Sequence, residues 1–258
     1  MQPFSLRAKR EAVAWEAVSA VVDPELDEPV TEMGFVERLD VAEDGSIDLD
    51  FRLPTYWCSP NFAFLMLDGL RVALEALSWG PRFRITLHDH LFAEEVNQGL
   101  AAGKRFGEIF AELAPDENLE ALRLKFKRKA FERRQESLLA AMRAAGWDAA
   151  RCVALDRRGL EAPPVEMTTQ FARYAEAYLA RFPQTGADAS VIVDWSGDAV
   201  GVAGLADHIA RLRSVRINME FNGALCRGLK DARYREKKDG ELSVVDFLPK
   251  AGLVEALR

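Results

Sequence analysis

The stretch that most constrains the fold is an alternating strand that runs directly into a helix, with a cysteine at the junction. Apolar and polar side chains alternate over residues 46–53, which predicts a strand with one buried face. Ser59 and Pro60 then suit the N-cap and the first helical position. Apolar residues follow at helical spacing: Phe62, Leu65, Met66, Leu70, Ala73 and Leu77. Cys58 is therefore expected just before a helix N-terminus.

This position gives Cys58 two candidate roles. Unpaired amide donors and the helix dipole favour an anion there, so we expect the thiol to ionise more readily than an average cysteine. A thiolate attacks electrophiles and binds metals. The alternative is that Cys58 packs inertly under the turn, because free cysteines are often buried and unreactive.

The segments around the junction predict a small α+β unit. The expected elements are a helix over 6–22, strands over 35–41 and 46–53, the helix after Ser59, and a third strand over 83–90. The two first strands form a hairpin around Asp44-Gly45. On the third strand, His88 and His90 are expected to share the outward face. The order predicts a small mixed sheet with packed helices.

Composition limits the classes of partner and compartment. Three cysteines, Cys58, Cys152 and Cys226, form no CxxC pair, which favours a reducing cytoplasm. No apolar run approaches membrane-spanning length, and the charged N-terminus does not match a signal peptide, so no membrane partner is expected. Residues 1–100 hold 8 Lys and Arg against 18 Asp and Glu, and the remainder 26 against 23. The acidic first part argues against nucleic acid as its partner.

Several motifs occur in a characteristic order. Asp23-Pro24-Glu25 follows the first helix, residues 33–36 (Met-Gly-Phe-Val) lead into a strand, and Thr55-x-x-Cys58 stands at the junction. The pattern continues through residues 83–87 to residues 95–105. In this order the motifs resemble the metal-sulfur cluster assembly family that includes PaaD and SufT, over roughly residues 8–114. The serine between the cysteine and Pro60 follows the eukaryotic pattern, whereas many bacterial members have proline directly after the cysteine.

The resemblance implies a maturation role rather than a turnover reaction. Family members assist assembly or insertion of iron-sulfur clusters into apo-proteins, and PaaD-type members accompany oxygenases that use iron centres. Cys58 matches the reactive or metal-binding cysteine, Thr55 the threonine before it, and Asp23 and Glu25 the acidic motif. The implied cofactor is iron or an iron-sulfur cluster, held transiently. The implied partner is an apo-metalloprotein client, either an iron-sulfur protein or an iron-dependent oxygenase component.

One thiolate cannot hold an iron-sulfur cluster, which normally takes four protein ligands. Asp23, Glu25, His88, His90 or a second copy of the chain in a homodimer are the candidates to complete a metal site, since carboxylates and imidazoles are common iron ligands. The alternatives are ordinary: the two histidines form an exposed polar face, and the acidic pair caps a turn.

The chain changes character near Ala114-Pro115, which predicts a first domain over 1–114 and a second over 115–258. A helix is expected over 119–145; its basic residues form either a solvated face or a docking surface for an acidic partner, with Arg123, Lys127 and Arg134 as contacts. A second small α/β unit follows, with helices alternating with strands over 151–155, 190–195 and 215–221.

The loops 194–197 and 222–226 each follow one of these expected strands, where loops often build sites. The sequence contains no GxGxxG, GxxxxGK[ST] or GxSxG motif, so nucleotide binding and serine hydrolysis have little support.

Three functions remain open. The first is a metallocentre maturation factor centred on Cys58. The second is a metal-free chaperone or adaptor that holds an apo-enzyme through the basic helix. The third is a thiol enzyme in which His88 or His90 serves as the base.

Overall fold

The computed structural model describes residues 5–111 and 119–234. These residues group into two compact units. The first unit contains residues 5–23, 27–111, Leu119 and 222–234, and the second contains Pro24–Leu26 and Glu120–Phe221. The domain boundary expected after residue 114 falls in 112–118, outside the described residues, and stays a prediction.

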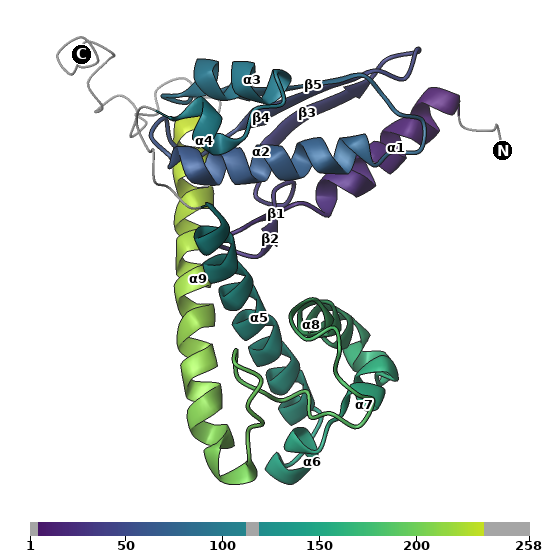
Figure 1. The fold of residues 1–258 in the computed structure, drawn as a ribbon, viewed down its shortest axis with the longest axis vertical. Coiled ribbons are helices and arrows are strands. Elements are labelled where there is room, and N and C mark those ends of the chain that lie inside the picture. The colour runs from purple at the N-terminus through teal and green to yellow at the C-terminus, as the bar shows by residue number, and fades with distance from the viewer. Residues whose placement is uncertain (1–4, 112–118, 235–258) are drawn as a thin grey trace. The chain divides into compact units, whose positions relative to one another are not determined.

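The first unit is built on a three-stranded sheet. Its strands are β3 (Val36–Val41), β4 (Ile47–Arg52) and β5 (Phe83–His88), in the order β3-β4-β5. β4 pairs antiparallel with β3 and parallel with β5. A parallel pair needs a crossover connection, and α2 (Pro60–Glu75) supplies it (Figure 1). A separate two-stranded ladder joins β1 (Val22–Asp23) to β2 (Glu28–Pro29).

The sheet has one apolar and one charged face because its residues alternate. On β4, Ile47, Leu49 and Phe51 are buried, whereas Asp48 and Asp50 face outward and pair with arginines of β5 and β3. α1 (Leu6–Ser19) packs against α2 and β3. The unit is completed by α3 (Ala93–Ala101), α4 (Phe106–Ile109) and the end of α9. It is therefore a two-layer arrangement of helices on a mixed sheet, and the predicted α+β class is confirmed.

The expected elements of this unit occur with small differences in length. The hairpin and the helix after Ser59 are present, while α1 ends at Ser19 and not at residue 22. β5 ends at His88 and not at residue 90, because Asp89 adopts a left-handed conformation with φ of 48°. This shorter strand changes the environment of His90, as described below.

The second unit is mainly helical. It contains α5 (Leu119–Ala144), α6 (Ala149–Val153), α7 (Arg157–Glu161), α8 (Thr168–Arg181), the short turns η1 (Val165–Met167) and η2 (Val202–Gly204), and the first part of α9 (Leu205–Tyr234). Its core gathers buried aromatic and aliphatic side chains. The central ones are Phe131, Phe171, Tyr174, Tyr178 and Ile192.

The second α/β pattern expected in this region is wrong in its strands. Residues 151–153 belong to α6 and residues 215–221 to α9. Residues 190–195 make only isolated bridges, from Ser190 to Asp156 and from Val193 to Ala199, with bends at Val191 and Ile192. Short apolar runs do not by themselves distinguish a strand from a helix. In 215–221 the alternation is incidental, since Met219 is buried while Ile217 and Phe221 are exposed on a continuous helix.

Within residues 5–111 and 119–234, none of the helices combines the length and the apolar character needed to span a lipid bilayer.

We predict that Phe51→Ala destabilises the first unit by about 3–5 kcal/mol, because it removes a large buried ring from the central strand. Phe51 is fully buried and packs edge-to-face on Phe35 with ring centroids 6.0 Å apart. Urea denaturation followed through NMR signals of the first unit measures the change. Val72→Ala on the exposed side of α2 is the control and should change the free energy of unfolding by no more than about 0.5 kcal/mol. Equal effects of the two substitutions would contradict the described core.

Candidate functional site

Cys58 lies in the connection between β4 and α2, directly before the helix, as its sequence context predicts. Ser59 occupies the N-cap and Pro60 the first helical position. The Ser59 carbonyl accepts hydrogen bonds from the backbone N–H groups of Phe62 and Ala63, while its hydroxyl makes no capping bond. Cys58 is partly exposed, and Trp57 beside it is 62% exposed. Cys58 therefore lies at a partly exposed turn of defined backbone geometry.

Thr55 contacts the thiol directly. Its Oγ1 lies 3.1 Å from the Sγ of Cys58, and the backbone N–H of Cys58 donates to the Thr55 carbonyl at 3.4 Å. A hydroxyl can accept a hydrogen bond from a thiol and can donate one to a thiolate. The three-residue spacing places Thr55 across a single turn from Cys58. This contact can therefore persist whether the sulfur is protonated or ionised.

His90 supports the backbone of the same turn. Its Nε2 lies 2.7 Å from the carbonyl oxygen of Cys58, and its Nδ1 accepts the backbone N–H of Phe92 at 3.2 Å. The Leu91 N–H donates to the Tyr56 carbonyl at 2.8 Å. These partners assign the imidazole proton to Nε2, since a neutral ring donates from one nitrogen and accepts at the other. The segment after β5 thus holds the Cys58 turn through two hydrogen bonds.

Burial lowers the pKa of His90 and outweighs the opposite effect of its hydrogen bond to the Cys58 carbonyl. His90 is 3% exposed, and a buried imidazole loses much of the hydration that stabilises its charged form. His90 is accordingly neutral near pH 7, in agreement with the acceptor role of its Nδ1. In this arrangement neither ring nitrogen is directed at the sulfur.

The two histidines do not share a strand face, which corrects the sequence expectation. His88 lies on the charged face of the sheet, where its Nε2 is 2.9 Å from Oδ1 of Asp50. The left-handed Asp89 ends the alternation, so that His90 turns into the protein. His88 therefore belongs to an ion-paired surface, and His90 belongs to the Cys58 turn.

The acidic motif is divided between different surroundings. Asp23 ends β1 and is nearly buried. Glu25 belongs to the second unit, where Lys129 Nζ lies 3.2 Å from its carboxylate. Across residues 5–111 and 119–234, no three His, Cys, Asp or Glu side chains gather in a group that could hold a metal ion. The described part of one chain therefore presents the Cys58 thiol without a set of accompanying ligands.

The predicted partner-binding residues differ in how far they are already engaged. Arg134 forms an ion pair with Glu176 at 2.8 Å, and Arg123 lies 3.8 Å from Glu120. Lys127 is exposed, and it makes no ion pair with any residue that the structure describes. Of the three, Lys127 is the one whose charge faces solvent.

The supporting role of His90 was missed by the sequence reasoning. Its contact with Cys58 joins residues 32 positions apart, and no local pattern specifies such a contact. The available signal was the parallel pairing of β4 with β5, which brings the segments after both strands to one edge of the sheet.

The loop 194–197, noted as a site candidate, does line a cavity in the second unit, which is described below.

We predict that the imidazole of His90 titrates below the ordinary histidine value of 6.5. Because its folded pKa is below its unfolded one, His90 contributes stability above about pH 6.5 that is lost as the pH falls toward the folded pKa. Imidazole NMR signals, followed against pH, measure this for the three histidines, and the signal missing in His90→Gln assigns the residue. Titration of His90 at or above 6.5 would contradict its burial.

Comparison with known proteins connects this geometry to a family. No curated protein and no solved structure gives a significant match. Residues 11–83 match the family model described as "Iron-sulfur cluster assembly protein". The match runs from α1 to the first residue of β5 and includes Thr55 and Cys58, which confirms the resemblance predicted for the N-terminal part. The segment of this chain that carries the Cys58 turn is therefore similar to iron-sulfur cluster assembly proteins.

Proposed function

We propose that this protein assists the assembly of an iron-sulfur cluster or an iron site in a client protein, with Cys58 as the group that contacts iron. The observation that carries this proposal is the Cys58 turn itself. It lies inside the segment that matches the cluster assembly family, Cys58 is partly exposed, and the Thr55 hydroxyl lies 3.1 Å from its sulfur.

A single cysteine ligand suits transient binding of iron. A thiolate is a strong iron ligand, but a cluster normally takes four protein ligands. A single cysteine leaves the other coordination positions to the client or to a second copy of the chain. Iron in this proposal is cargo that passes to the client, and a partial ligand set favours its release. Asp23, Glu25 and His88 stay candidates for added ligands only where the chain rearranges to bring them to Cys58.

The role is that of an accessory factor rather than an enzyme. A thiol enzyme would need a base near the sulfur, and the nitrogens of His90 already bond to backbone groups, while His88 pairs with Asp50.

The client is proposed to be an iron-sulfur protein or an iron-dependent oxygenase component. Trp57 is an exposed aromatic residue beside the thiol, of the type that often anchors protein interfaces.

We predict that the full chain binds iron saturably under anaerobic conditions and that Cys58→Ser abolishes this binding. Absorbance and bound-iron analysis during titration with ferrous iron measure it. Cys226→Ser is the matched control, because it removes another partly exposed thiol and should leave iron binding unchanged. Equal iron binding by wild type and Cys58→Ser would refute the role proposed for this cysteine.

The metal-free adaptor remains a second candidate because α5 carries basic side chains that face solvent. Lys125 and Lys127 are exposed and make no ion pair within the described part of the chain. An adaptor of this kind would lose its client when both are changed to glutamate and would be insensitive to Cys58→Ser. Crosslinking in cells distinguishes the two: the maturation proposal expects less iron in the client crosslinked to Cys58→Ser, and the adaptor expects the same amount.

A further inference from the structure

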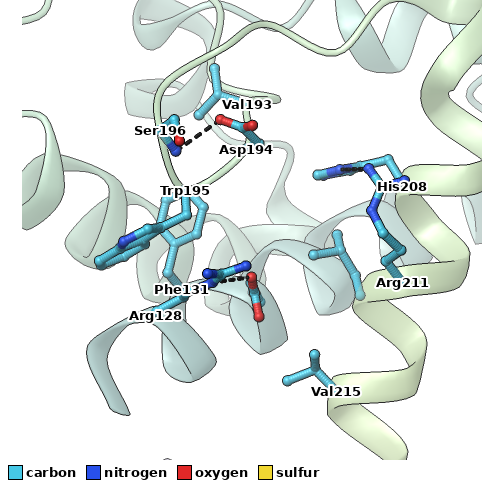
Figure 2. A pocket seen from close by; sticks show the side chains of 11 residues that line it. Arg128, Phe131, Val193, Asp194, Trp195, Ser196, His208, Arg211 and Val215 are labelled. Atoms are coloured by element: carbon cyan, nitrogen blue, oxygen red, sulfur yellow. Dashed lines mark hydrogen bonds and ion pairs between the residues drawn. The ribbon is translucent and has the colours of Figure 1, made fainter. Parts of the chain in front are cut away.

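A cavity of about 290 Å³ lies within the second unit, between α5, residues 193–196 and α9 (Figure 2). Its apolar lining consists of Phe131, Val193, Trp195, Leu212 and Val215. Three of these residues, Phe131, Val193 and Leu212, are buried. The size is near the lower end of the range for small-molecule pockets. The rest of the lining is polar or charged: Arg128, Glu132, Asp194, Ser196, His208 and Arg211.

A chain of buried hydrogen bonds fixes the walls of this cavity. Gln135 is fully buried and donates to the carbonyl of Val193 at 2.9 Å and to the hydroxyl of Tyr174. Tyr174 in turn donates to the Val191 carbonyl at 2.6 Å. The Oε1 of Gln135 bonds to Nε2 of His208, which lines the cavity. Since every member has a partner, the network rigidifies the site before any ligand arrives.

Both acidic side chains of the lining have hydrogen-bond partners. Glu132 accepts from Arg128 at 2.8 Å. One carboxylate oxygen of Asp194 accepts three backbone N–H groups, at 2.8 to 3.0 Å, from the residues that follow it: Ser196, Gly197 and Asp198. Neither carboxylate is paired with Arg211.

Arg211 is the second cation of the lining, and its side chain belongs to an exposed residue. It bonds to Nδ1 of His208 at 3.4 Å and forms no ion pair with any residue in 5–111 or 119–234. Burial lowers the pKa of His208, and the charge of Arg211 lowers it further, so the ring is neutral near pH 7. A guanidinium against a neutral imidazole, at the edge of this cavity, attracts an anion.

We propose that this cavity binds a small carboxylate with an apolar body. The guanidinium of Arg211 takes the carboxylate, since its planar fork matches that group, and the body lies against Trp195, Leu212 and Val215. One cation suits a singly charged acid better than a phosphate, which would call for more donors. The site is separate from Cys58 and does not depend on the maturation role.

The probe that tests this is 3-phenylpropionate, compared with 3-phenylpropanamide, which has the same body without the charge. Calorimetric titration of the full chain should give saturable binding of the acid with a Kd of about 1 mM or tighter. The amide should bind at least roughly tenfold more weakly, and so should the acid to Arg211→Gln. Arg213→Gln removes the same charge from the same helix outside the cavity lining and should leave the affinity unchanged.

A second variant tests the cavity independently of the charge. Val215→Trp fills the space while keeping Arg211, and it should abolish binding of 3-phenylpropionate with the circular dichroism spectrum unchanged. The proposal is overturned if wild type shows no saturable binding, if acid and amide bind equally, or if Arg211→Gln binds as wild type does. Displacement of the acid by equimolar inorganic phosphate would also overturn the proposal, because the site would then recognise negative charge without an apolar body.

Discussion

The parallel pairing of β4 with β5 is the constraint on which the first unit depends. A parallel neighbour forces the chain to cross over, and α2 makes that connection over the apolar face of the sheet. It also brings the residues after both strands to the same edge. Cys58 follows β4 and His90 follows β5, so the 2.7 Å contact between the His90 ring and the Cys58 carbonyl is a consequence of this topology. The thiol is held at a sheet edge by elements from both strands.

Much of this arrangement could be predicted because it is encoded locally. The alternation over 46–53 defines a strand, Ser59-Pro60 defines the start of a helix, and the spacing of Thr55 and Cys58 puts their side chains across one turn. The exit from β5 could not be predicted in this way. Alternation continues to residue 90 in the sequence, whereas Asp89 takes a left-handed conformation that aspartate tolerates better than most residues. That single residue separates His88, on the charged face, from the buried His90.

In the second unit, the alternation of apolar and polar residues does not predict the secondary structure, because contacts with distant residues determine which side chains are buried. Residues 215–221 alternate like a strand, yet they continue a helix that begins at Leu205, and just one of their four apolar side chains, Met219, is deeply buried. Extending an existing helix adds a hydrogen bond per residue without a new nucleation cost, so it prevails over the weak pattern. The buried hydrogen bonds of Gln135 could not be predicted from its neighbours in the sequence either. Its partners Tyr174, Val193 and His208 are 39, 58 and 73 residues away.

The proposed function depends on iron being bound through the Cys58 sulfur. Mössbauer spectroscopy of the full chain loaded with ⁵⁷Fe reports the ligand atoms of the iron, and Cys226→Ser and Cys58→Ser can be compared under the same loading. We expect a thiolate-ligated iron signal in wild type and in Cys226→Ser that is missing in Cys58→Ser. Iron bound entirely by oxygen and nitrogen ligands in wild type, or an unchanged thiolate signal in Cys58→Ser, would contradict it.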